Sequence, residues 1–191
     1  MPATQLDPRT ALVIVDLQKG LSAFSFARPF AEVVSNAARL ADAFRRASLP
    51  VVLVRVIPGH PDEGWRQPRV SQTIPIVASP GFSELMPALA PRLGDLVVTK
   101  RHWNAFYGTE LDMQLRRRGV TGLVLAGVRT CIGVEGTARA AHERAYNLTF
   151  AEDAMADIDE SAHEHSVTRI FPRLGEVDAT DGILSLLPRT S

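Results

Sequence analysis

The sequence predicts an α/β fold, a single domain of three layers in which a six-stranded, mostly parallel sheet carries helices on both faces. Five short apolar runs rich in β-branched residues indicate strands, and segments with helical spacing of apolar residues alternate with them. The runs are almost continuously apolar, as in a sheet that is covered on both faces. A length of 191 residues fits one domain, which we expect to span residues 1–191.

Each element follows from a local pattern. Strands are expected at residues 11–17, 51–57, 96–99, 123–128 and 147–151, with a short sixth strand near 177–179. Helices are expected at 30–48, where apolar residues recur at helical spacing, at 110–118, which Gly119 ends, and at 134–146 and 160–171. This alternation predicts right-handed crossovers between parallel strands.

Composition narrows the class of partner. Lys plus Arg and Asp plus Glu both number 21, so the net charge is zero, and we expect neither a nucleic acid nor a membrane as partner. The start of the chain has no signal-peptide core and no apolar run reaches membrane-spanning length, which favours a cytoplasmic location. The single cysteine, Cys131, excludes an intramolecular disulfide and a cysteine-rich zinc site.

Residues 58–80 do not follow the alternation, because they hold five prolines and no periodic pattern. A connection of this length is typical of a lid or a binding loop, and the alternative is a plain surface excursion. Trp65 and the group from His60 to Asp62 could face a pocket or a neighbouring subunit.

Three chemically capable groups follow predicted strands. Asp16 ends the first strand, Lys100 follows the third, and Cys131 and Gly133 follow the fourth at the start of a helix. Ligands of parallel α/β sheets bind outside the carboxyl ends of the strands. If the strand order switches beside the first strand, an acid, an amine and a helix N-terminus meet in one crevice. Lys100 is one of only two lysines, and the other, Lys19, is expected on the surface.

Three segments carry a resemblance to a known family: ALVIVDLQ, VVTKRHWNAFYGTELD and GVRTCIGVEGTARAAHERAYNLTFAEDAMAD. The chain resembles the isochorismatase-like hydrolase superfamily, which also includes nicotinamidases and N-carbamoyl amidohydrolases. The resemblance implies a six-stranded parallel sheet, a cis peptide between Val128 and Arg129, and a catalytic set of Asp, Lys and Cys. By motif position the Asp is Asp16 and the Lys is Lys100.

The third catalytic position differs from the amidase pattern G-V-x-T-x-x-C-V. Counted from Gly127, the nucleophile position is Gly133, and Cys131 lies two residues early. Isochorismatases also carry glycine there and cleave a vinyl ether without a covalent intermediate. The resemblance therefore implies acid–base hydrolysis of a vinyl ether-type or related bond, with Asp16 as proton donor and Lys100 beside it. Two alternatives stay open: a cysteine amidohydrolase in which Cys131 reaches the pocket, and a catalytically idle binding paralogue.

The remaining candidates concern binding. Arg129 and Arg101 could pair with a substrate carboxylate, or be solvated arginines on the rim. We expect a small-molecule substrate, no metal or other cofactor, and a homodimer or higher homo-oligomer. His163 and His165 point in different directions on a helix, so they are expected on a solvated face rather than at a metal. The candidate substrate-binding residues are Gly133, Arg129, Thr130, Phe106 and Trp103.

Overall fold

Six parallel strands form one sheet, which confirms the predicted fold class. The structure is a computed structural model, and it describes residues 2–57, 69, 71 and 79–188. The strands are β1 (Thr10–Val15), β2 (Val51–Val56), β3 (Leu96–Lys100), β4 (Gly122–Val128), β5 (Asn147–Ala156) and β6 (Glu176–Asp178). Their order across the sheet is β3-β2-β1-β4-β5-β6.

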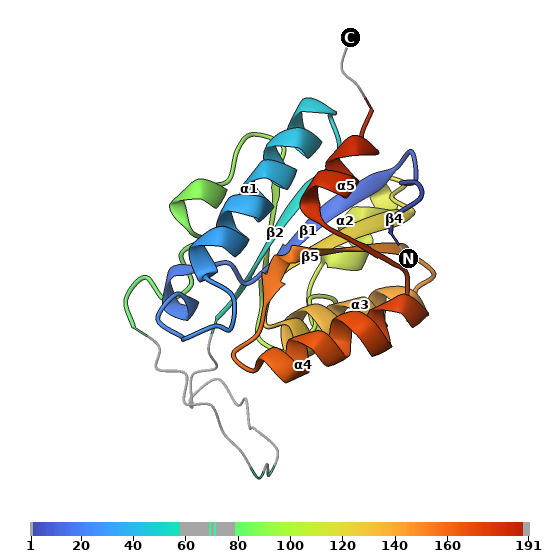
Figure 1. The fold of residues 1–191 in the computed structure, drawn as a ribbon. Coiled ribbons are helices and arrows are strands. Elements are labelled where there is room, and N and C mark those ends of the chain that lie inside the picture. The colour runs from blue at the N-terminus through green and yellow to red at the C-terminus, as the bar shows by residue number, and fades with distance from the viewer. Residues whose placement is uncertain (1, 58–68, 70, 72–78, 189–191) are drawn as a thin grey trace.

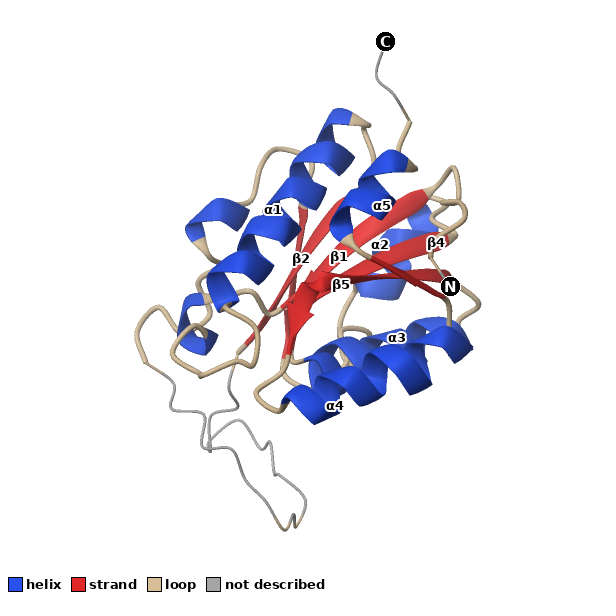
Figure 2. Cartoon of the chain, in the orientation of Figure 1, coloured by secondary structure: helices blue, strands red, loops and turns tan. Residues whose placement is uncertain are grey.

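Helices cover both faces of this sheet, as Figures 1 and 2 show. On one face, α1 and α5 pack on a core that includes Leu12, Leu40 and Ile183; on the other, α2, α3 and the segment after α4 enclose a second core. The helices are α1 (Phe30–Arg46), α2 (Leu111–Arg117), α3 (Glu135–Glu143), α4 (Glu160–His165) and α5 (Thr180–Ser185). Three short 3₁₀ helices, η1 (Lys19–Leu21), η3 (Pro87–Leu89) and η6 (Phe171–Arg173), and two π-helical turns, η4 (Thr130–Val134) and η5 (Ser166–Ile170), complete the described elements.

Three elements differ from expectation. β5 continues five residues beyond the predicted end at 151, because Glu152 and Asp153 interrupt the apolar run without ending the strand. The predicted helix 160–171 divides into α4, η5 and the start of η6. The sequence pattern did not indicate α5, a six-residue helix whose first turn is held by the carboxylate of Asp153 through two hydrogen bonds from Thr180.

The strand order reverses between β1 and β4, so the predicted switch beside the first strand is confirmed. The third strand is not a direct neighbour of the first, because β2 separates β3 from β1. Lys100, at the end of β3, therefore reaches the first strand only by extending its side chain past the end of β2.

Most of the predicted loop 58–80, with Trp65 and the group from His60 to Asp62, lies outside the described residues. Within the described part of the chain, no helix combines the length and the apolar character needed to cross a bilayer.

Candidate active site

Asp16 is placed by the end of β1. Its backbone N–H donates to the carbonyl of Val54 on the neighbouring strand β2 at 2.9 Å, and its carbonyl accepts from Gln18. Its φ is 57°, in the left-handed region that Asp tolerates better than most side chains do. The strand therefore turns at Asp16, and the residue is buried, with 5% exposure, at the carboxyl edge of the sheet.

Lys100 lies against Asp16. Its Nζ is 2.7 Å from Asp16 Oδ2 and also donates to the carbonyl of His102 at 3.0 Å. The Lys100 side chain is 2% exposed, so a buried charge-assisted pair forms between the ends of β1 and β3. The predicted contact between these two side chains is confirmed.

The pair controls the ionisation of Asp16. Burial raises the pKa of Asp16 to about 6, and the charge and hydrogen bond of Lys100 limit that rise. The second carboxyl oxygen, Oδ1, is buried and has no hydrogen-bond partner among the described residues. Asp16 is therefore a carboxyl group that can hold a proton just below neutral pH and has one oxygen left for another molecule.

Gly133 also lies close to Asp16. A Cβ built on Gly133 would be 3.4 Å from Asp16 Oδ2, 3.2 Å from Val15 Cγ1 and 2.9 Å from the carbonyl oxygen of Val128. The predicted meeting of Asp16, Lys100 and Gly133 at one edge of the sheet is confirmed. Gly133 thus lies close to Asp16 but has no side chain that could act as a nucleophile.

The approach of β4 to β1 depends on Gly127. Its φ is 119°, and a Cβ there would lie 2.0 Å from the carbonyl oxygen of Val15, so only glycine fits. The peptide between Val128 and Arg129 is cis, as the resemblance implied. The π-helical turn η4 (Thr130–Val134) follows at once and carries Gly133 to Asp16.

Cys131 belongs to a different cluster. Its backbone N–H donates to Asp157 Oδ2 at 2.9 Å, and its thiol also hydrogen-bonds the Asp157 carboxylate. Burial, together with this hydrogen bond, raises the pKa of Cys131 to about 12. Cys131 is thus held at Asp157, after the end of β5, whereas the partner of Asp16 is Lys100.

Arg129 and Thr130 also contact groups near the end of β5. Arg129 Nε donates to Asp157 Oδ1 at 2.8 Å, and the side chain of Arg129 is 21% exposed. The buried hydroxyl of Thr130 is 2.9 Å from Nδ1 of His163, so the hydrogen-bonding group of Thr130 faces α4. The expectation of a solvated His163 needs correction: His163 is half-buried, and burial, with the nearby charge of Arg28, lowers its pKa.

The two aromatic candidates lie apart from each other. Phe106 is buried, and its ring packs 6.0 Å from that of Tyr146 and under the guanidinium of Arg144, at the end of the sheet where β5 begins. Trp103 is 69% exposed beside the first turn of α3. Arg101 is exposed as well.

Two residues near the site were missed by sequence reasoning. Gln18 is fully buried and its amide exchanges hydrogen bonds with Val56 at the end of β2, while also donating to the carbonyl of Phe82. Asp157, also fully buried, follows β5 and binds both Arg129 and Cys131. The signal that could have found Asp157 is the one that found Asp16, an acid directly after a buried strand.

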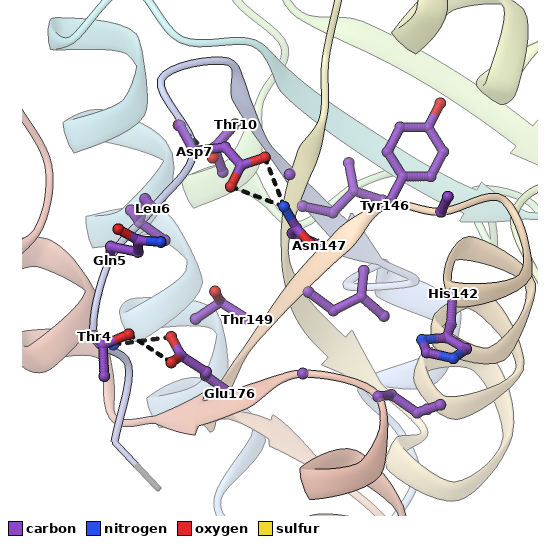
Figure 3. A pocket seen from close by; sticks show the side chains of 16 residues that line it. Thr4, Gln5, Leu6, Asp7, Thr10, His142, Tyr146, Asn147, Thr149 and Glu176 are labelled. Atoms are coloured by element: carbon purple, nitrogen blue, oxygen red, sulfur yellow. Dashed lines mark hydrogen bonds between the residues drawn. The ribbon is translucent and has the colours of Figure 1, made fainter.

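A cavity of about 580 Å³ lies at the opposite, amino edge of the sheet (Figure 3). The carboxylates that border it are already hydrogen-bonded within the chain, Asp7 to Asn147 and Glu176 to Thr4. Neither Asp16 nor Lys100 lines this cavity. Across the described part of the chain, no group of three His, Cys, Asp or Glu side chains is arranged to hold a metal ion.

The comparisons with known proteins agree with this arrangement. The family model that describes an isochorismatase domain matches residues 10–181. The chain belongs to the isochorismatase family. Members of this family are hydrolases, and the protein is accordingly a hydrolase.

Relatives of the family span a range of similarity. The isochorismatase family protein YecD of Escherichia coli O157:H7 is 40% identical, covering 93% of this chain and 96% of its own. An isochorismatase family protein of known structure from Burkholderia thailandensis is 39% identical with a TM-score of 0.90, covering 96% and 97%. The N-carbamoylsarcosine amidase of Thermoplasma acidophilum is 31% identical with a TM-score of 0.71, covering 91% and 97%.

Proposed function

We propose that the protein hydrolyses a small molecule at a vinyl ether-type or related bond, by acid–base chemistry in which Asp16 donates the proton. The observation that carries this proposal is that Gly133 lies next to Asp16. In the amidase pattern of the family, this position holds the nucleophilic cysteine. A buried acid with a raised pKa supports the role of proton donor, since a general acid must be protonated near the working pH.

The reaction balances with water as the only co-reactant. Asp16 transfers a proton to the methylene carbon of the vinyl ether, and the double-bond electrons form the new C–H bond. The resulting oxocarbenium ion takes up a water molecule, whose proton passes back to the Asp16 carboxylate. The hemiketal then collapses, which breaks the C–O bond and releases an alcohol and a methyl ketone.

Lys100 positions the acid and limits its pKa. Its ammonium group has three hydrogens. Among the described residues, Asp16 and the His102 carbonyl take two of them, which leaves one for water or substrate. Gly133 places no side chain between a substrate and the carboxyl group of Asp16. Arg129 has the charge to bind a substrate carboxylate, and the exposed ring of Trp103 could contact a substrate from the rim.

A second candidate, a cysteine amidohydrolase, is favoured by the 31% identity to an N-carbamoylsarcosine amidase. It would use Cys131, whose raised pKa and hydrogen bond to Asp157 leave little thiolate at neutral pH. The position of this thiol supports the acid–base reaction over the amidase reaction.

The test is a hydrolase screen of vinyl ethers, amides and N-carbamoyl compounds on the wild type and Asp16→Asn. We expect turnover of a vinyl ether by the wild type, with one deuteron in the new methyl group when the reaction runs in D2O and is quenched early. Turnover of amides alone contradicts the proposal and favours the amidohydrolase. A wild type that is inert on all three classes favours the binding paralogue.

The homo-oligomeric state and the cytoplasmic location stay predictions. Light scattering on the purified protein measures the first, with a dimer or a larger assembly expected. A fluorescent fusion to the chain shows the second, with signal throughout the cell interior expected.

A further inference from the structure

We propose that Asp157 is a positioning residue, which fixes the turn that carries Gly133 and presents Arg129 to an anionic group of the substrate. Asp157 follows β5 directly and is completely buried at the same edge of the sheet as Asp16. Its role in fixing the turn stands by itself, whereas the role of Arg129 rests on the function proposed above.

The carboxylate of Asp157 is surrounded by donors. Oδ1 accepts from Arg129 Nε and from the backbone N–H of Ile158, both at 2.8 Å, and Oδ2 accepts from the backbone N–H of Cys131 at 2.9 Å. Burial acts to raise the pKa of Asp157, but the hydrogen bonds from Cys131 and Arg129 hold it below its ordinary value. Asp157 is therefore an ionised buried group, and such a group holds its partners firmly.

The partners of Asp157 lie on both sides of one residue of the turn. Arg129 and Cys131 flank Thr130, and Gly133 follows two residues after Cys131. The backbone N–H groups of Ile132 and Val134 donate to the carbonyl of Arg129, at 3.2 Å and 3.1 Å. A displacement of Arg129 would consequently move the part of η4 that places Gly133 against Asp16.

The guanidinium of Arg129 is held at one end only. Nε is bound to Asp157, while the two Nη groups have no hydrogen-bond partner among the described residues, and the side chain is partly exposed. A guanidinium that is fixed at Nε and open at its Nη groups suits a carboxylate, which accepts two parallel hydrogen bonds. We therefore assign Arg129 to substrates that carry a carboxylate.

The reactivity of Cys131 reports on the contact between Cys131 and Asp157. It can be measured without interference because Cys131 is the only cysteine of the chain. The rate of its alkylation by iodoacetamide is measured against pH for the wild type and Asp157→Asn. Loss of the carboxylate removes the acceptor of the thiol proton and leaves the nearby Arg129 charge to stabilise a thiolate. We expect alkylation at pH 8 at least about tenfold faster in Asp157→Asn, since one unit of pKa changes the thiolate fraction tenfold.

Asp153→Asn is the matched control. Asp153 lies on β5, the strand that Asp157 follows, and its carboxylate accepts two hydrogen bonds from Thr180 in α5. Its alkylation profile should equal that of the wild type. Equal profiles for wild type and a folded Asp157→Asn overturn the positioning role. If Asp157→Asn does not fold, the wild-type profile decides: a thiol pKa above about 10 supports the role, and a lower value overturns it.

The anionic subsite is tested by a binding measurement that needs no turnover. A negative result for the subsite can therefore be distinguished from a negative result for the proposed reaction. Propionate and propionamide, which have nearly the same shape, are titrated into ¹⁵N-labelled protein and followed by NMR. We expect the wild type to bind propionate at least about tenfold more tightly, the scale of one charge-assisted pair, and both Arg129→Met and Asp157→Asn to lose this preference. Equal binding of the two probes by the wild type overturns the subsite.

Discussion

The Cα of Gly133 faces the carboxyl group of Asp16 so closely that a methyl group on Gly133 would lie 3.4 Å from Asp16 Oδ2. Glycine at this position therefore brings the backbone against Asp16 and presents no side chain that could attack a substrate. The only thiol of the chain is nearby in sequence but is bound to Asp157 at the end of β5. Under the proposed function, Asp16, paired with Lys100, is the group that performs the chemistry.

The first prediction concerns Gly133. Gly133→Ala should lower turnover by about tenfold or more, because its Cβ would lie only 2.9 Å from the Val128 carbonyl oxygen and would displace substrate from Asp16. Gly136→Ala, one turn later, is the matched control. Its Cβ would lie at an ordinary 3.6 Å from Asn104, so it should keep activity and raise stability by about 0.5–1 kcal/mol. Equal activities of the two variants would contradict the role of Gly133.

The second prediction concerns pH. A carboxyl group with a pKa of about 6 carries its proton below that pH and loses it above, so kcat/KM should fall about tenfold for each pH unit above 6. Because Asp16 and Lys100 interact closely, the midpoint belongs to the pair. A profile measured from pH 4.5 to 9 that stays level or rises between 6 and 8 would exclude Asp16 as the proton donor.

The third prediction concerns Lys100. Lys100→Met should move the falling limb of the pH profile to higher pH, because Lys100 lowers the pKa of Asp16. A carboxyl whose folded pKa lies further above the ordinary 3.8 destabilises the folded state as pH rises. The free energy of unfolding of the variant should therefore decrease, relative to wild type, between pH 4 and 8.

Lys19→Met is the control for this experiment. Lys19 forms an exposed pair with Glu84, and such pairs contribute only about 0–1 kcal/mol. Its urea unfolding should follow the wild type at every pH, and its pH–rate profile should be unchanged. A Lys100→Met variant that behaves like Lys19→Met would show that the buried pair has no influence on the acid.

The sequence predicted much of the fold because strands buried on both faces are nearly continuous apolar runs. It located Asp16 and Lys100 because each lies at the end of such a run, and Gly133 because it holds the nucleophile position of the family motif. The neighbours of β1 were harder to predict: β3 is not one of them, and Lys100 bridges the gap with the length of its side chain. Local sequence patterns do not predict the separation between β3 and β1.

Asp157 was missed for a related reason. Glu152 and Asp153 made β5 look five residues shorter than it is, so the residue at its true end was not considered. Helical spacing correctly predicts that the rings of His163 and His165 point in different directions. It does not predict which side chains either ring contacts. The ring of His163 meets Thr130, a contact between segments 33 residues apart in sequence. Tertiary contacts of this kind are set by packing and not by local periodicity.

The central claim is that Asp16, and not Cys131, performs the chemistry. The most direct measurement compares Asp16→Asn with Cys131→Ser on the substrate that the screen identifies, with both variants shown to be folded by circular dichroism. The account predicts that Asp16→Asn loses at least about a hundredfold in kcat, the scale of one general acid, while Cys131→Ser keeps most of its turnover. An inactive but folded Cys131→Ser, together with a thioester trapped on the wild type and detected by mass spectrometry, would contradict it.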